Sequence, residues 1–371
     1  MNKKTKKVLK ITGISLGSLL LIVTVAITLA IHFVFTPEKL TPVVVQTANS
    51  SLNARVNLGS VDLTFFSTFP RFGLRMENGT LVSKALRDTL WQRRDTLMSF
   101  KKAVLVVNPI DYLTQKKITV YRLTVDSARV YAHIDKEGRA NWDIMPDSTT
   151  TDTATTDTTR LAPGGIDIRR VALRHATVTF DDRQARVFAN LWDANLALQA
   201  RLQRGHSMLK VDFSNRNVLF WQEGELLVNR VSTRLQANLE LNRQQRTLSL
   251  NNALLDVNGL ELDLKGTLRR DTVERAADVD MQYSLHAPSL KTVIGLIPQS
   301  ILKKETLDAK GEVIVNGTLK GLYGKGHMPL ATLTVNINQA SAHYEGMPYG
   351  IDEITADFFG QVDLTKRQSS Y

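Results

Sequence analysis

Hydrophobic and polar residues alternate along most of this chain, which is the pattern of β-strands with one apolar face. The clearest example is Val231–Leu241, where the odd positions are mostly aliphatic and the even positions are polar. Similar alternation runs from Leu260 to Leu268, after the turn dipeptide Asn258-Gly259. Such strands are joined by tight turns and have one face exposed to solvent. They predict a mainly β protein with a long antiparallel sheet.

Three segments depart from this period. The run from Ile11 to Phe35 carries no formal charge. As a helix it would be about 37 Å long, enough to cross a hydrocarbon core of about 30 Å. Short helices are also predicted after Pro37 and at Pro288–Pro298. Two short helices are too few to cover the apolar face of a long sheet.

The lysines before the charge-free run set its expected orientation. Five lie within the first ten residues: Lys3, Lys4, Lys6, Lys7 and Lys10. Because positive charge concentrates on the cytoplasmic side of a span, we expect a cytoplasmic tail at 1–10 and a transmembrane helix at 11–35. A signal peptide cleaved near Ala30 is the alternative, but the apolar run is longer than the usual core of such a peptide.

A segment rich in threonine and aspartate divides the rest of the chain. Its composition at 147–165 cannot bury a core, so a linker or flexible loop is expected there. The sequence therefore predicts a juxtamembrane helix with a first β region at 36–146, and a second β-groove region at 166–371. Because the sequence stops just after an alternating stretch, we interpret the second region as truncated at its C-terminus.

Composition argues against several classes of function. The chain has no cysteine, which excludes disulfides and thiolate metal sites. Its net charge of +11 falls to +6 without the five N-terminal lysines, and no later stretch interleaves basic and aromatic residues as a nucleic-acid surface requires. The seven histidines lack metal-ligand spacing, and no nucleophile with a base is evident. We expect no nucleic acid, no metal, no cofactor and no enzymatic activity, and an envelope hydrolase is the least favoured class.

The apolar face of the predicted sheet must be covered. The sheet either closes on itself as a sandwich or barrel, or curls into an elongated apolar groove occupied by lipid acyl chains; the pattern alone leaves both open. In a groove, burial contributes about 0.8 kcal/mol per methylene at every position, so a chain can slide. The expected lining is Val231, Leu235, Leu239, Leu241, Leu260, Leu262 and Leu264.

Four phenylalanines follow soon after the charge-free run, and two roles are open for them. They either plug the base of the sheet or form a membrane-proximal entrance for acyl chains, since aromatic rings favour the membrane interface. These residues are Phe65, Phe66, Phe69 and Phe72.

Several segments resemble the N-terminal part of AsmA-like proteins of the Bacteroidota type. The most specific are the juxtamembrane block Pro37–Leu81 and the string Gly138-Arg139-Ala140-Asn141-Trp142-Asp143-Ile144. The strand that opens at Ile166 and the regions Gly317–Pro329 and Ser341–Leu364 are also similar, so the likeness covers essentially the whole chain.

This resemblance implies a periplasmic β-groove similar to chorein-type, bridge-like lipid transfer proteins. It implies a single-pass anchor in the inner membrane, a cytoplasmic N-terminus, and a role in phospholipid transport to the outer membrane or in outer-membrane biogenesis. The implied partners are phospholipids, the inner membrane and an outer-membrane or envelope protein. The alternative is a structural or assembly factor for outer-membrane proteins that acts through the edges of its sheet.

Overall fold

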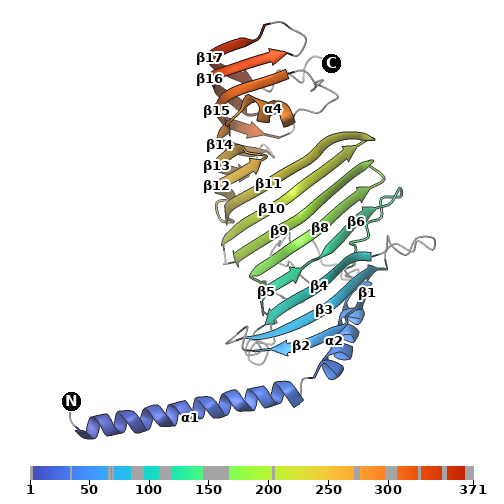
Figure 1. Ribbon diagram of the computed structural model, residues 1–371, viewed down its shortest axis with the longest axis vertical. Coiled ribbons are helices and arrows are strands. Elements are labelled where there is room, and N and C mark those ends of the chain that lie inside the picture. The colour runs from blue at the N-terminus through green and yellow to red at the C-terminus, as the bar shows by residue number, and fades with distance from the viewer. Residues whose placement is uncertain are drawn as a thin grey trace.

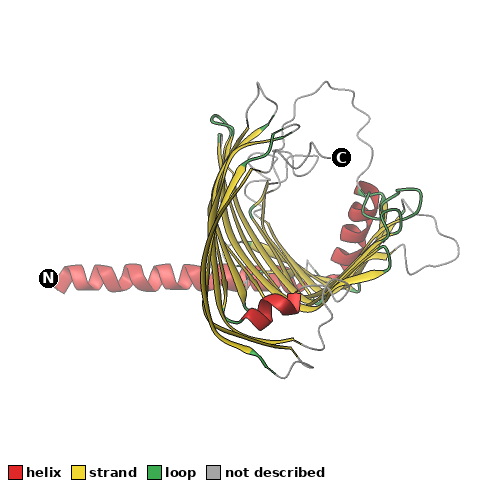
Figure 2. Cartoon of the chain, turned by 90° about the horizontal axis from the view of Figure 1, so that it is seen from above, coloured by secondary structure: helices red, strands yellow, loops and turns green. Residues whose placement is uncertain are grey.

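One β-sheet dominates the computed structural model. The structure describes residues 3–33, 36–65, 68, 71–84, 96–107, 119–144, 167–202, 205–270, 276–296, 307–324, 327–344 and 349–363. Within these residues every strand belongs to a single sheet, which rises along the long axis of the molecule (Figure 1). Seen down that axis, the sheet is curled and its outline is open on one side (Figure 2). Of the two predicted alternatives, the curled sheet is confirmed.

The strands follow one another almost entirely as hairpins, because tight turns join most successive strands. Their bounds are β1 (Ala54–Asn57), β2 (Ser60–Thr64), β3 (Phe72–Ser83), β4 (Thr96–Val107), β5 (Thr119–Asp126), β6 (Arg129–Ile134), β7 (Asp167–Ile168), β8 (Arg170–Asp182), β9 (Val187–Leu202), β10 (His206–Gln222), β11 (Glu225–Asn242), β12 (Thr247–Val257), β13 (Leu260–Arg270), β14 (Ala277–Ala287), β15 (Leu307–Tyr323), β16 (Leu330–Tyr344) and β17 (Ile351–Asp363). From β8 to β17 each strand pairs antiparallel with the next along the chain.

One junction in the sheet is parallel, which corrects the expectation of a purely antiparallel sheet. β8 runs parallel to both β5 and β6, and the short β7 runs parallel to β5. A parallel pair needs a crossover connection of a dozen or more residues. The connection between β6 and β7 contains the threonine- and aspartate-rich stretch, whose residues lie outside the described part of the chain, and it is long enough for this return. Strands on both sides of that stretch therefore pair within one sheet.

The two faces of the sheet differ in how they bury small side chains. On one face, alanines are almost completely buried although the described sheet has a single layer: Ala103 (2%), Ala176 (0%), Ala194 (2%), Ala237 (7%) and Ala253 (4%). On the opposite face Ala172 and Ala197 are only half-buried. Neighbouring side chains converge and cover small residues on the concave side of a curled sheet. The face that buries its alanines is therefore the concave face.

Helix α2 (Pro37–Ser51) closes one end of the sheet beside β1 and β2 (Figure 1). Pro37 occupies its first turn, where a missing N–H costs nothing. The Thr41 hydroxyl accepts a hydrogen bond of 3.0 Å from the Val61 N–H, and the Asn49 side chain bonds both backbone groups of Val56. Val61 is fully buried, so the helix seals the first strands against solvent.

Helices α1 (Lys3–Phe33) and α4 (Leu290–Leu296) account for the other two helical predictions. α4 lies within the predicted Pro288–Pro298 helix and contacts β14 and β15. α1 is one continuous helix that extends away from the sheet (Figure 1) and contains most of the predicted span at 11–35. None of the helices in the described part of the chain combines the length and apolarity required to cross a membrane. The transmembrane component of the predicted fold is thus not shown by the structure.

Candidate functional site

The sheet register aligns apolar side chains into rows that cross the sheet from strand to strand. The first apolar row passes through fourteen strands, β2 to β5 and β8 to β17, with one residue from each. Its members are Val61, Met76, Ala103, Val125, Leu173, Leu196, Phe213, Leu235, Leu255, Leu262, Leu285, Val315, Val335 and Phe358. No polar or charged residue interrupts this row.

A second apolar row runs beside the first on the same face. It passes from Leu63 on β2 through Leu123, Val211 and Leu264 to Gly360 on β17, again one residue per strand. Because side chains alternate along a strand, the residues between the two rows point to the opposite face. Many of these are charged or polar, so only the concave face is continuously apolar.

Two glycines allow aromatic rings to lie flat on this face. A Cβ added to Gly79 would overlap the ring of Phe100, and one added to Gly317 would overlap the ring of Tyr283. Tyr283 also donates a hydrogen bond of 2.9 Å from its hydroxyl to the Thr332 carbonyl. Each ring covers the gap that its glycine leaves in the apolar surface.

The structure places all seven residues expected to line a groove on this one face. Leu235 and Leu262 belong to the first apolar row, and Leu264 belongs to the second. The other four pair with apolar neighbours on adjacent strands: Val231 with Val218, Leu239 with Leu209 and Leu250, Leu241 with Leu248, and Leu260 with Val257. Their contact with lipid stays a prediction.

Strands β2 to β5 and β8 to β10 also contribute to the same face, which was not predicted from the sequence. Met76, Leu173 and Phe213 belong to the first apolar row although no lining role was assigned to them. Alternation around these residues was a visible signal. Their alignment depends on the parallel junction and on register shifts, such as the one between Val106 and Val107, and alternation carries no information about either.

The predicted entrance residues are only partly described. The rings of Phe65 and Phe72 lie 5.0 Å apart between centroids, at the end of the sheet that α2 closes. Phe66 and Phe69 lie outside the described residues. The five N-terminal lysines lie at the start of α1. The roles of both groups remain predictions.

A buried polar network fixes the end of β6 next to β8. Asn141, which is fully buried, donates from its side chain to the Tyr131 carbonyl at 2.7 Å and accepts from the His133 N–H at 2.9 Å. The Tyr131 hydroxyl donates to Asp181 at 2.7 Å, and the His133 ring lies 2.9 Å from the Asp181 carbonyl. These contacts hold the Gly138–Ile144 string against the sheet, so the string has a structural role.

Three carboxylates among the described residues have a lowered pKa. For Glu38, at the start of α2, a backbone hydrogen bond and one with the Thr36 side chain lower the pKa. Burial raises the pKa of Asp135, but the hydrogen bonds from Arg139 and from the Glu137 N–H outweigh burial and hold that pKa below its ordinary value. The His286 ring, at 2.9 Å, and the Asn338 amide lower the pKa of Glu312. The pairs formed by Asp135 and by Glu312 organise turns or strand ends.

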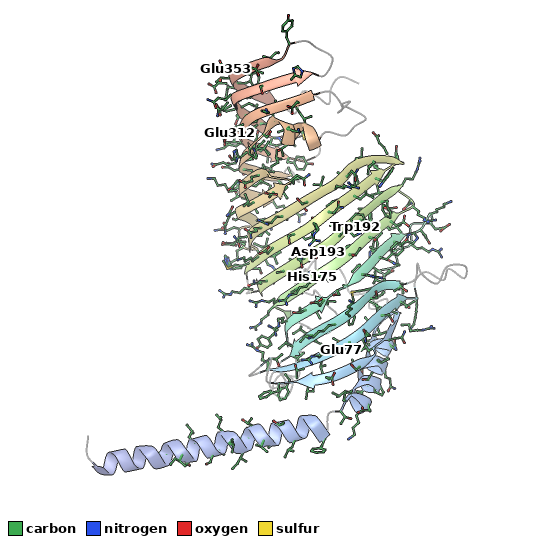
Figure 3. All side chains as sticks on the ribbon, viewed as in Figure 1. Glu77, His175, Trp192, Asp193, Glu312 and Glu353 are labelled. Carbon is green, nitrogen blue, oxygen red and sulfur yellow. The ribbon has the colours of Figure 1, made fainter. Side chains whose placement is uncertain are left out.

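A second polar cluster interrupts regular pairing between β8 and β9. His175 and Asp193 both have positive φ, and their side chains meet at 3.0 Å; Arg216 lies 3.1 Å from the other carboxylate oxygen (Figure 3). The cluster is largely exposed. Among the described residues, no group of three or more His, Asp or Glu side chains is arranged to hold a metal ion.

Fold and face together define a class: a single-layer, curled β-sheet protein with one continuous apolar surface. The AsmA family model matches residues 5–278. The chain belongs to the AsmA family, which confirms the family inferred from its sequence. No curated protein and no solved structure matches the chain.

Proposed function

We propose that this protein binds phospholipid acyl chains on its concave face and conducts them along the sheet, for lipid transport to the outer membrane or for outer-membrane biogenesis. The observation that carries the proposal is the unbroken first apolar row. At a spacing of about 4.8 Å between strands, the row extends for about 60 Å. Membership of the AsmA family and the curled sheet both support this function.

The uniform chemistry of the first apolar row favours sliding of an acyl chain along the row over tight binding at one position. Aliphatic neighbours such as Leu235, Leu255 and Leu262 follow one another with nearly uniform chemistry. Each buried methylene contributes about 0.8 kcal/mol wherever it lies, so displacement by one strand changes the binding free energy little. The proposed transfer needs no catalytic residue.

The proposal places the protein at the inner membrane, with α1 as its single-pass anchor and the sheet in the periplasm. Large apolar side chains project from α1 into the surroundings, including Leu16 (67% exposed) and Leu20 (69% exposed). The hydroxyls of Ser18, Thr24 and Thr28 donate to carbonyls of the same helix, which removes the cost of burying them in lipid. The N-terminal lysines favour a cytoplasmic N-terminus.

A second candidate function rests on the last strand. β17 pairs with β16 and with no other described strand, and its Phe358 and Phe359 side chains are 61% and 68% exposed. An exposed strand edge can add a strand from another polypeptide. An assembly factor for outer-membrane proteins would use this edge.

Photo-crosslinking in cells distinguishes the two functions. A photoreactive amino acid replaces Leu235 on the apolar face, and a matched control replaces Gln236, which points to the other face of β11. We expect phospholipid adducts at position 235 and at most background levels at 236. Polypeptide adducts at 235 without lipid adducts would contradict the lipid function and favour the assembly factor.

A further inference from the structure

A cavity of about 910 Å³ lies near one end of strands β4, β5 and β8 to β12. Its lining includes Leu209 and Leu239 from the apolar face together with residues of the opposite face such as Lys210. Six cationic residues line it: Arg71, Arg122, Arg169, Arg170, Arg201 and Lys210. No acidic side chain is among its described lining residues. We call this cavity the basic hollow.

Two of the arginines contact the ring of one tyrosine. The guanidinium carbon of Arg71 lies 3.7 Å from the centroid of the Tyr121 ring, and that of Arg169 lies 4.8 Å from it. Both distances are in the range of a cation–π contact, so one ring holds two arginines at the hollow.

The strand register places further cationic residues of the hollow on neighbouring strands. Arg170 pairs with Gln199, and Gln199 pairs with Lys210, so these three side chains lie side by side on neighbouring strands. Arg170 donates a hydrogen bond of 3.2 Å to the Gln199 amide oxygen. Arg201 and Lys210 form no ion pair with any described carboxylate. Their charges are therefore available to a ligand.

Nearby carboxylates on the polar face of the sheet do not neutralise the hollow. Asp212 is on β10 and Glu240 is on β11, and neither lines the cavity. Glu240 already contacts His206 at 3.3 Å and Asn251 at 3.2 Å. The net charge that a ligand meets in the basic hollow is positive.

The basic hollow lies next to one long rim of the curled sheet. Arg201 is one residue before the end of β9, and Met208, opposite it in the register, is two residues after the start of β10. At about 3.3 Å per residue, these positions lie within about 7 Å of the turn that forms the rim. A molecule bent over this rim can touch both faces.

Successive hairpin turns lie alternately on the two long rims of the sheet. The charged residues of these turns differ between the two rims. Turns on the rim near the basic hollow carry arginines: Arg201, Arg243, Arg246, Arg269 and Arg270. Turns on the other rim carry both signs: the carboxylates Asp182, Glu223, Glu225, Asp256 and Glu261, and the arginines Arg183 and Arg186. Asp278 is an acidic exception on the basic rim, and it is paired with Arg269 at 2.7 Å. Among the described turn residues, positive charge is therefore in excess on the rim near the basic hollow.

We infer that the basic hollow binds a phosphate group. Arginine forks bind phosphate oxygens in a bidentate manner, and several cations on one wall suit a doubly charged group. The inference rests on the proposed function for its ligand: a phospholipid with acyl chains on the apolar rows would bend over the basic rim and place its phosphate in the hollow. A soluble phosphate compound offers the same chemistry.

The test compares two lipids that share acyl chains. Fluorescent phosphatidic acid and fluorescent diacylglycerol are titrated against the full chain in nonionic detergent micelles, and inorganic phosphate is titrated separately by calorimetry. The hollow variant combines Arg170→Gln, Arg201→Gln and Lys210→Gln. The control combines Arg183→Gln, Arg186→Gln and Lys310→Gln, which removes as many positive charges from the other end of the strands.

We expect the wild-type chain to bind phosphatidic acid at least about tenfold more tightly than diacylglycerol, since charge-assisted hydrogen bonds are the stronger kind. The hollow variant should lose this preference and keep its affinity for diacylglycerol, whereas the control should keep both. If neither lipid binds but the wild type binds inorganic phosphate and the hollow variant does not, the phosphate site stands with a soluble ligand and the proposed function fails. A hollow variant that keeps the preference, or a wild type that binds none of the three ligands, overturns the inference.

Discussion

Replacing Leu262 with aspartate is expected to reduce lipid occupancy at least about tenfold while the protein still folds. Leu262 lies within the first apolar row, between Leu255 and Leu285. A carboxylate there must lose hydration when an acyl chain covers it, which costs several kcal/mol, and about 1.4 kcal/mol already corresponds to a factor of ten. In the lipid-free sheet this half-buried position stays accessible to water, so folding tolerates the charge. Lipid bound per protein, measured by mass spectrometry after extraction, checks the expectation.

Thr267→Asp is the matched control for this substitution. Thr267 is exposed on the opposite face of the same strand, β13. An aspartate at this position therefore adds the same charge without touching the apolar rows. Its lipid occupancy should equal that of the wild type. Equal occupancy in Leu262→Asp and wild type, with circular dichroism showing that both are folded, would contradict the role of the row.

Replacing Asn141 with alanine is expected to lower the free energy of unfolding by about 2–4 kcal/mol. The substitution leaves the His133 N–H and the Tyr131 carbonyl without their partner in a fully buried place. Each unsatisfied buried backbone group costs about 1–3 kcal/mol. Equilibrium denaturation in urea, followed by far-UV circular dichroism, measures the loss.

Asn141→Asp separates the donor from the acceptor in this network. Aspartate keeps an oxygen for the His133 N–H but cannot donate to the Tyr131 carbonyl, and it buries a charge. We expect it to destabilise the fold at least as much as alanine does. A change below about 0.5 kcal/mol in both variants, the usual range of surface substitutions, would show that the network does not hold the sheet.

The fold class and one face of the candidate site could be predicted from the sequence because both depend on local period. Alternation at Val231–Leu241 and at Leu260–Leu268 shows directly which side chains share a face. Tight turns then make neighbouring strands antiparallel, as for β11, β12 and β13. The family resemblance rested mainly on the block Pro37–Leu81 and the string Gly138–Ile144, and Asn141 holds that string against the sheet.

What the sequence could not predict depends on pairing between distant residues. The parallel pairing of β8 with β5 brings Val171 beside Leu123 across the threonine- and aspartate-rich stretch, and no local pattern specifies it. Bulges also shift the register, for example between Asn238 and Leu239 on β11. The basic hollow depends on the same pairings, because they bring Arg122 near Arg201 although the two are far apart in the sequence.

Native mass spectrometry with lipid extraction tests most directly whether the apolar rows hold lipid. The measurement uses residues 38–371, since α1 extends away from the sheet, expressed in a bacterial periplasm and purified without detergent exchange. We expect a folded protein that carries co-purified phospholipid in at least stoichiometric amount. A folded protein free of lipid would contradict this expectation.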